Sequence, residues 1–188
     1  MAKQFNVLST DHQDFIRRQH IFFTASATAD SRVNVSPREI GALRIVDETT
    51  VIYLDRTGSG NETAAHMLAD GRITIMFCAV AGPPQIMRLY GKGSAVGWDS
   101  AEFKQLIRQY YDDDTPLGAR QIIKVEFDLV QTSCGYGVPL FAYQGERLAI
   151  ENWHDNKGPD GILAYWKDNN LSSMDGLPTG LNPGDETG

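Results

Sequence analysis

The regular pattern of apolar and polar residues along this chain is mainly that of β-strands. The clearest strand is 121–133, where apolar residues alternate with charged ones: Ile123, Val125, Phe127 and Leu129 against Lys124, Glu126 and Asp128. Residues 72–80 begin with a similar alternation, and residues 49–55 have the composition of a buried strand. A hairpin from Phe22 to Pro37 and a strand at 85–97 bring the expected total to about six strands.

Helical periodicity is confined to fewer segments. Residues 99–112 carry apolar side chains at helical spacing behind a possible N-cap, Asp99 or Ser100. Residues 9–19 form a shorter candidate with Ser9 or Thr10 as N-cap. The strands are mostly joined by connections too short for parallel crossovers. The pattern therefore predicts a mainly β protein, a closed or nearly closed antiparallel β-barrel with peripheral helices, and argues against a Rossmann fold.

Composition narrows the class of partner. The chain has 188 residues, a net charge of -7 and a sequence pI near 5.0, which argues against nucleic acid or an anionic membrane as the main partner. The first residues lack the apolar core of a signal peptide, and no apolar run is long enough to span a bilayer. Two cysteines and four scattered histidines form neither a disulfide framework nor a zinc pattern. We expect a reducing, cytoplasmic setting and no metal site.

The C-terminal part has a different composition. Residues 172–188 are rich in Gly and Pro, yet Met174, Leu177 and Leu181 offer apolar side chains that can dock. We therefore divide the chain into a barrel domain, residues 1–145, and an extension, residues 146–188. The extension is expected to contain helix followed by a tail that packs on its own domain or on a partner subunit.

A glycine-rich loop, "GSGNETAAHM" at residues 58–67, separates a predicted strand from a short helix. Ser59 and Glu62 match a capping box, and Asn61 is an alternative cap. The same helix start, with hydroxyl groups from Ser59 and Thr63, would suit a phosphate. The loop lacks the Gly-Lys-Ser/Thr ending of a Walker A motif, which argues against ATP or GTP hydrolysis. Both interpretations, cap and phosphate cradle, remain open from the residues.

Polar residues in two strands have a similar ambiguity. Asn34 and Ser36 share one face of the predicted hairpin strand, and Arg38 follows directly. They form either a solvated face or a row that faces a ligand, with Arg38 as the cation that the glycine-rich loop lacks. Arg88, between apolar neighbours, either makes an exposed ion pair or reaches inward to a phosphate or a flavin. Hydrolase motifs such as HExxH are absent.

Four motifs in order resemble the pyridoxamine 5'-phosphate oxidase-like family. They are "FFTASATADSRVNVSP", "VIYLDRTGSGNETAAHM", "RITIMFCAVAGPPQIMRLYGKG" and "SCGYGVP", and the resemblance runs from about residue 10 to about residue 145. The later segment "WHDNKGPDGILAYWKDNNLSSMDGLPTGL" resembles an uncharacterised subgroup of that family. The resemblance implies a six-stranded antiparallel split β-barrel, a homodimer, and FMN held at the subunit interface.

The resemblance also implies which residues bind the cofactor. The strand after the first hairpin turn contacts the flavin and its phosphate in the family, and the loop and helix start after the third strand grip the phosphate. A further strand residue near the flavin ring falls around Ile86 to Arg88. The positions that match in this sequence are Asn34, Val35, Ser36, Arg38, Ser59, Asn61, Glu62, Thr63 and Arg88.

Two departures from the family pattern bear on the substrate. The true oxidase has an Arg-Lys pair at the helix start, where this chain has Glu62 and Thr63. Charge neutralisation of a phosphate would then fall to Arg38, Arg88 or Arg56. Of the Arg-x-His-x-Arg-like substrate motif only Arg147 is present, which argues against pyridoxamine phosphate as the substrate.

The expected function is that of an FMN-binding oxidoreductase that acts on an unidentified small molecule. The flavin would carry the redox chemistry, so that no side chain has to be an obligate acid or base, and we assign no catalytic residue. Two alternatives remain: a non-catalytic flavin- or haem-binding module that acts as carrier or sensor, and a reductase that uses the deazaflavin F420.

Overall fold

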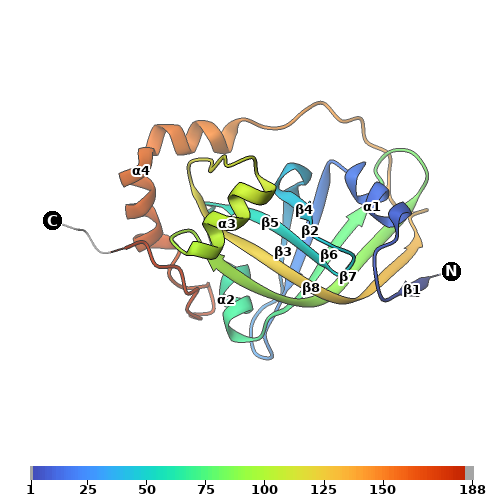
Figure 1. The fold of residues 1–188 in the computed structure, drawn as a ribbon, viewed down its shortest axis with the longest axis horizontal. Coiled ribbons are helices and arrows are strands. Elements are labelled where there is room, and N and C mark those ends of the chain that lie inside the picture. The colour runs from blue at the N-terminus through green and yellow to red at the C-terminus, as the bar shows by residue number, and fades with distance from the viewer. Residues whose placement is uncertain (1, 185–188) are drawn as a thin grey trace.

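The computed structural model describes residues 2–184 and contains one curled antiparallel sheet (Figure 1). The strand order is β3-β2-β6-β7-β8-β5-β4, and β1 pairs with β8. The strands are β1 (Lys3–Phe5), β2 (Ile21–Ser26), β3 (Asn34–Glu39), β4 (Leu43–Ile45), β5 (Thr50–Arg56), β6 (Arg72–Cys78), β7 (Gln85–Gly97) and β8 (Ala119–Cys134). This curled sheet with peripheral helices is a split barrel, as expected.

The described residues contain eight strands, so the expected number of six was wrong. The two additional strands, β1 and β4, are only three residues long, which is too short for a pattern of alternation to appear. The predicted hairpin is confirmed, since β2 and β3 pair antiparallel with Phe22 opposite Arg38 and Ser26 opposite Asn34.

A register shift in the longest strand pair corrects one predicted face. The β7–β8 pairing shifts between Tyr90 and Gly91, so that Tyr90 faces Leu129 while Gly91 faces Phe127. The extra residue between them on β8 reverses the alternation. Ile123, Val125 and Phe127 are buried as predicted, but Val130 takes the next core position, and Leu129 is only partly buried. The prediction that Leu129 shares their face was therefore wrong.

Helices lie around the barrel rather than within it. Helix α1 (Thr10–Arg17) begins at the N-cap Ser9, whose hydroxyl accepts from the N–H of His12 at 3.3 Å. Helix α2 (Glu62–Ala69) follows the glycine-rich loop, and a short 3-10 helix (Ile40–Ala42) joins β3 to β4. Helix α3 (Ala101–Tyr110) is capped by Ser100, one of the two predicted residues.

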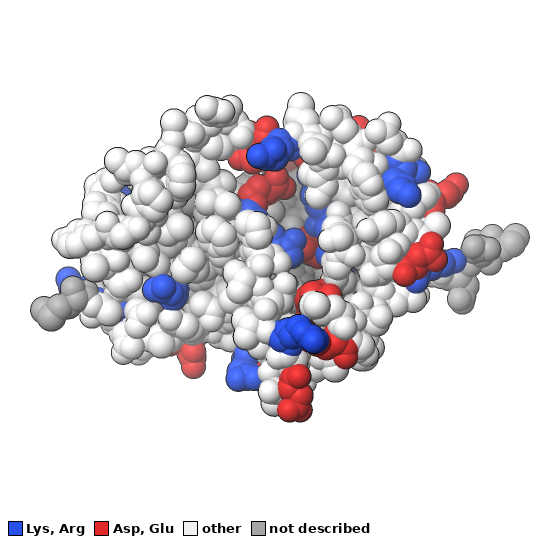
Figure 2. All heavy atoms as spheres, turned by 180° about the vertical axis from the view of Figure 1, so that it is seen from behind, with Lys and Arg blue, Asp and Glu red and all other residues white. Residues whose placement is uncertain are grey.

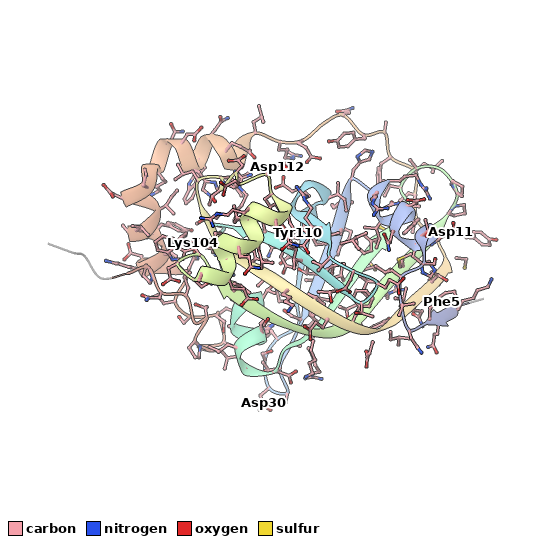
Figure 3. All side chains as sticks on the ribbon, viewed as in Figure 1. Phe5, Asp11, Asp30, Lys104, Tyr110 and Asp112 are labelled. Atoms are coloured by element: carbon pink, nitrogen blue, oxygen red, sulfur yellow. The ribbon has the colours of Figure 1, made fainter. Side chains whose placement is uncertain are left out.

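Helix α3 covers a second, smaller core on the outer side of β5, β7 and β8. Its buried residues Phe103 and Ile107 pack with Ile52 and Ile122 of the strands. Figure 3 labels Tyr110, which packs against this cluster, and Lys104, which is exposed on the same helix. The helix is therefore amphipathic in the way that its sequence predicts.

The C-terminal extension continues with helix α4 (Ala149–Asn169) and a tail along the same end of the molecule (Figure 1). Two helical parts of α4 meet at Gly158, which has a positive φ of 67°, and Pro159 is the next residue. A positive φ and a proline both interrupt a helix, so α4 is kinked there. Ile162, Trp166 and Leu181 form a small core of their own. The tail returns to the barrel through an ion pair between Asp175 and Arg32. The final residues of the predicted extension, 185–188, lie outside the described residues.

Within residues 2–184, none of the helices has the length and apolar character needed to cross a membrane.

Candidate functional site

A polar pocket lies where β3 faces the end of β5 and the start of α2. Strand β3 ends the sheet on one side, so that its inward-facing side chains extend into this gap. The pocket has a volume of about 330 Å³. Its lining consists of Asn34, Ser36, Pro37, Arg38, Arg56, Gly58, Ser59, Gly60, Asn61, Glu62, Thr63, Arg120 and Ile150. Because three arginines line it, we call it the anion pocket.

Seven of the nine residues predicted from the sequence line this one pocket. They come from two places, β3 and the segment from the glycine-rich loop into α2: Asn34, Ser36, Arg38, Ser59, Asn61, Glu62 and Thr63. The other two lie elsewhere. The side chain of Val35 is on the opposite face of β3 and 61% exposed. Arg88 is on β7, separated from β3 by β2 and β6, and does not line the pocket.

The polar row on β3 faces the pocket. The Asn34 Nδ2 group donates to Thr63 Oγ1 at 3.1 Å, which connects β3 to the first turn of α2. The Ser36 hydroxyl donates in turn to Asn34 Oδ1 at 3.3 Å. These two hydrogen bonds hold the side chains in place, and Asn34, Ser36 and Thr63 all line the pocket.

A buried carboxylate organises the arginines of the pocket. Asp55 at the end of β5 is 1% exposed. Its Oδ1 accepts from Arg38 Nη1 at 2.5 Å, and its Oδ2 accepts from Arg120 Nε and Gln121 Nε2, both at 2.7 Å. Burial alone would raise the pKa of Asp55, but the nearby charges of Arg120 and Arg38 outweigh it and lower the pKa to about 2. Asp55 is therefore ionised at neutral pH, and one carboxylate is shared by two guanidinium groups.

A third arginine, Arg56, is held from the other side of the pocket. Its Nη1 donates to Glu151 Oε1 of helix α4 at 2.6 Å and lies 3.8 Å from Glu39 Oε1. The hydrogen bond from Arg56 lowers the pKa of Glu151. The Nε atoms of Arg38 and Arg56 are both buried and have no hydrogen-bond partner among residues 2–184. Because buried donors are nearly always paired in folded proteins, two unpaired arginine donors beside one pocket are unusual.

The start of α2 is left without a side-chain cap. Asn61 occupies the N-cap position, but its side chain makes no capping hydrogen bond. Instead its Oδ1 accepts from Gln121 Nε2 at 2.7 Å and its Nδ2 donates to the carbonyl oxygen of Asn170 at 3.3 Å. The uncapped N–H groups and the helix dipole favour an anion at this end of the helix.

The predicted capping box between Ser59 and Glu62 was wrong. Ser59 is exposed and its hydroxyl makes no hydrogen bond to α2 in the described structure. Both carboxylate oxygens of Glu62 accept instead from the N–H of Met174 at 3.1 Å. The tail, 112 residues away in the sequence, satisfies this carboxylate, which no local pattern could indicate.

Sequence reasoning also missed Arg120 and Asp55 as parts of the site. Arg120 is 2% exposed at the beginning of β8, and Asp55 is the one acidic residue of β5, between Leu54 and Arg56. A charged residue at the end of a buried strand is a weak signal by itself, since such residues more often lie in solvent.

A larger apolar cavity adjoins the anion pocket. It has a volume of about 730 Å³ and shares Pro37, Arg38 and Ile150 with the pocket. Segment 138–150 forms one wall, and residues of β2, β3 and β6 form the other. In that segment the ring of Tyr143 stacks on His20, with centroids 3.8 Å apart. Figure 2, which views the molecule from behind, shows a hollow in this face with Lys or Arg and Asp or Glu side chains inside it.

Comparison with known proteins agrees with this architecture. The family model for pyridoxamine 5'-phosphate oxidase matches residues 8–134. A curated relative, the pyridoxamine 5'-phosphate oxidase family protein ustO of Aspergillus flavus, is 37% identical over 139 residues, or 72% of this chain. The chain spans 55%, about half, of the length of that relative.

Two solved structures share the fold. A variant of HupZ from Group A Streptococcus superposes with a TM-score of 0.52 at 17% identity, over 66% of this chain and 98% of HupZ. HutZ, the heme storage protein of Vibrio cholerae, superposes with a TM-score of 0.50 at 14% identity, over 69% of this chain and 97% of HutZ. The family match covers strands β2 to β8 and the loop of the anion pocket, and the chain therefore belongs to the pyridoxamine 5'-phosphate oxidase family.

Proposed function

We propose that this chain binds FMN, with the cofactor's phosphate in the anion pocket, and acts as an FMN-dependent oxidoreductase. The observation that carries the proposal is the convergence of Arg38, Arg56 and Arg120 with the uncapped start of α2 on one pocket, where the Nε atoms of Arg38 and Arg56 have no partner among residues 2–184. A phosphate monoester offers several acceptor oxygens and a double negative charge, which suit both guanidinium donors and helix N–H groups.

The other residues around the pocket fit the remaining parts of FMN. Asn34 and Ser36 present polar groups along β3 that suit the hydroxyl groups of the ribityl chain. The adjoining cavity of about 730 Å³ is mainly apolar, as the sites of planar cofactors usually are. Bound FMN would supply the redox chemistry, while the chain binds, orients and shields it.

Glu62 does not argue against a phosphate in the pocket. A carboxylate beside a phosphate is unfavourable when both are unpaired. Here the N–H of Met174 donates to both Glu62 oxygens and draws the carboxylate toward the tail. In place of the Arg-Lys pair that the family has at the helix start, Arg38, Arg56 and Arg120 on strands line this pocket and would neutralise the phosphate.

Cofactor binding is tested by the spectrum and mass of what co-purifies after growth with ample riboflavin, and by the melting temperature with added FMN. We expect a flavin spectrum and a rise in melting temperature with FMN. A haem spectrum would support the alternative of a non-catalytic haem-binding module, since HutZ is a heme storage protein. Preference for F420 in competition with FMN would support a deazaflavin reductase. No flavin absorbance together with no FMN-dependent rise would refute the proposal.

The phosphate position is tested by two alanine variants. Arg38→Ala removes a guanidinium with a free buried donor, whereas Ser59→Ala removes an exposed hydroxyl. Since hydrogen bonds to charged groups contribute about 1.5–3 kcal/mol, Arg38→Ala should weaken FMN binding by about ten- to a hundredfold. Ser59→Ala should weaken it less. Equal FMN affinity in Arg38→Ala and wild type would show that another group neutralises the phosphate.

Turnover is tested separately from binding. Anaerobic mixing of the flavin-loaded protein with NADH or NADPH should bleach the flavin if the chain is an oxidoreductase. A stable oxidised spectrum with either donor would favour a carrier or sensor. The absence of the Arg-x-His-x-Arg-like motif argues against pyridoxamine phosphate as the substrate, so the substrate proposed is another small molecule.

We also propose that two copies of the chain form a homodimer through the outer face of the sheet. Across β3, β2, β6 and β7 this face carries apolar side chains in register, among them Pro37, Phe23 and Met76 in the row that ends at Arg88. Val35, in the next row, is 61% exposed. A second copy would cover Val35 and the exposed part of this row, and would bring the flavin site to the subunit interface.

Sedimentation analysis of Val35→Asp tests the dimer. We expect the wild-type chain to sediment as a dimer and Val35→Asp to shift toward monomer. Leu68→Asp, a matched control on α2 whose side chain is 60% exposed, should leave the dimer intact. A monomeric wild type would refute this interface.

We propose a reducing, cytoplasmic location for the protein. Both of its cysteines, Cys78 and Cys134, are free thiols in the structure. Microscopy of the full-length protein carrying a fluorescent tag tests this location, and signal outside the cytoplasm would refute it.

A further inference from the structure

The C-terminal extension contacts the anion pocket through one buried residue, Asn170. The family match ends at residue 134, so α4 and the tail that follows it are additions to the matched region. Asn170 comes directly after α4 and is 0% exposed. In Figure 1 the tail beyond α4 lies next to the beginning of α2, which is where the anion pocket is located.

Among residues 2–184, the side chain of Asn170 makes hydrogen bonds to Arg120 and Gly58, and both of these residues line the anion pocket. Its Oδ1 accepts from Arg120 Nη1 at 2.9 Å, and its Nδ2 donates to the carbonyl oxygen of Gly58 at 3.3 Å. One amide group thus joins a guanidinium on β8 to the glycine-rich loop. Because Arg120 is also held by Asp55 at 2.7 Å, its guanidinium is restrained from two sides.

The main chain of Asn170 contacts the same loop. Its carbonyl oxygen accepts from Asn61 Nδ2 at 3.3 Å and from Thr179 Oγ1 at 2.8 Å. The first of these bonds helps to keep the Asn61 side chain away from the N–H groups of α2, where an asparagine at the N-cap position would ordinarily bind. The second ties Asn170 to the tail. The placement of Asn170 therefore influences both the loop and the free end of α2.

We propose that Asn170 is a positioning residue for the phosphate of the cofactor. It holds Arg120, Gly58 and Asn61 in the arrangement that leaves the α2 N-terminus and the arginine donors available to an anion. This inference rests on the proposed FMN binding at that pocket and adds that the extension, rather than the barrel alone, shapes the phosphate site. Two hydrogen bonds from one buried amide fix the pocket wall, so their loss frees it to rearrange.

Comparison of FMN with riboflavin isolates the phosphate. Riboflavin has the same ring and ribityl chain and lacks only the phosphate. In Asn170→Ala we expect FMN affinity to fall by about tenfold while riboflavin affinity stays within about twofold of wild type. Flavin fluorescence quenching measures both constants on the full-length protein. If Asn170→Ala does not fold, Asn170→Ser, which leaves a smaller void, serves in the same comparison.

The neighbouring residue provides the matched control. Asn169 is exposed, and its Nδ2 donates to the carbonyl oxygen of Tyr165 within the same helix at 3.1 Å. Asn169→Ala should leave both affinities unchanged. Equal losses of FMN and riboflavin affinity in Asn170→Ala would show a merely structural role and overturn the inference. No loss of either affinity would overturn it as well.

The outcome for the wild-type chain separates this inference from the proposed function. A wild type that binds FMN no more tightly than riboflavin would refute the phosphate site itself, and the role of Asn170 with it. A wild type that prefers FMN, together with an Asn170→Ala variant that keeps the full preference, would refute only the role of Asn170.

Discussion

The buried Asp55 should be one of the residues on which the stability of this chain most depends, and Asp55→Asn tests this directly. The substitution keeps the shape of the side chain and removes its charge. Arg38 and Arg120 would then lose the carboxylate that they share at 2.5 and 2.7 Å. The side chains of Asp55 and Arg120 are 1% and 3% exposed, so that water cannot replace the lost interaction at Arg120.

The size of the effect follows from two considerations. The pKa of Asp55 falls from 3.8 to about 2 in the folded chain, a difference that corresponds to roughly 2 kcal/mol of stability at neutral pH. Breaking a buried ion pair by removing one partner generally costs about 3–5 kcal/mol, because the other charge remains buried. We expect Asp55→Asn to lose about 2–5 kcal/mol, out of a total of roughly 5–15 kcal/mol for a typical domain.

The pH dependence has a defined sign. Because the folded-state pKa of Asp55 lies below its unfolded value, its contribution is fully present above about pH 4. It is lost as the pH falls from about 4 toward 2, where the folded protein also takes up the proton. Asp55→Asn should therefore show a weaker loss of stability with acid than the wild type.

Urea unfolding measured by circular dichroism, at pH 7 and in steps down to pH 3, gives both quantities. Asp128→Asn, at an exposed position on the neighbouring strand β8, is the control and should change the unfolding free energy by less than about 0.5 kcal/mol. If the unfolding free energy of Asp55→Asn is within about 1 kcal/mol of wild type at pH 7, the buried network contributes little to stability and the reasoning is refuted.

Three further substitutions test other contacts. Gly91→Ala would place a methyl group against the Glu126 carbonyl oxygen at the β7–β8 register shift and should cost about 3 kcal/mol in urea unfolding, whereas Gly41→Ala, with open space around it, should be nearly neutral. Trp166→Phe removes the hydrogen bond to Thr57 Oγ1 at 2.6 Å inside the core beneath α4, and a loss of about 1–3 kcal/mol is expected; no change in melting temperature would contradict it. Glu62→Gln keeps an acceptor for the tail but removes a negative charge from the anion pocket, so FMN affinity measured by fluorescence should rise, and weaker binding would show that the carboxylate assists the site.

Local pattern was sufficient for most elements of the barrel. Strand-forming residues on both sides of a turn predicted the β2–β3 hairpin, the caps Ser9 and Ser100 began their helices, and the row Asn34, Ser36, Arg38 appeared as polar residues on one strand face. These features depend on the chain within a few residues, through side-chain direction along a strand or the first turn of a helix. The sequence by itself therefore determined six of the eight described strands, the two capped helices and the polar residues that share a face of β3.

Only the tertiary structure decided the contacts that complete the pocket. Glu62 is bound by Met174 instead of Ser59, because the tail returns to α2 from 112 residues away. Val130 replaces Leu129 in the core, because the register shift depends on the partner strand β7. Asp55 becomes the shared partner of Arg38 and Arg120 only when β3, β5 and β8 are brought together. Such pairings are set by packing and burial over long sequence distances, which periodicity along a single segment does not contain.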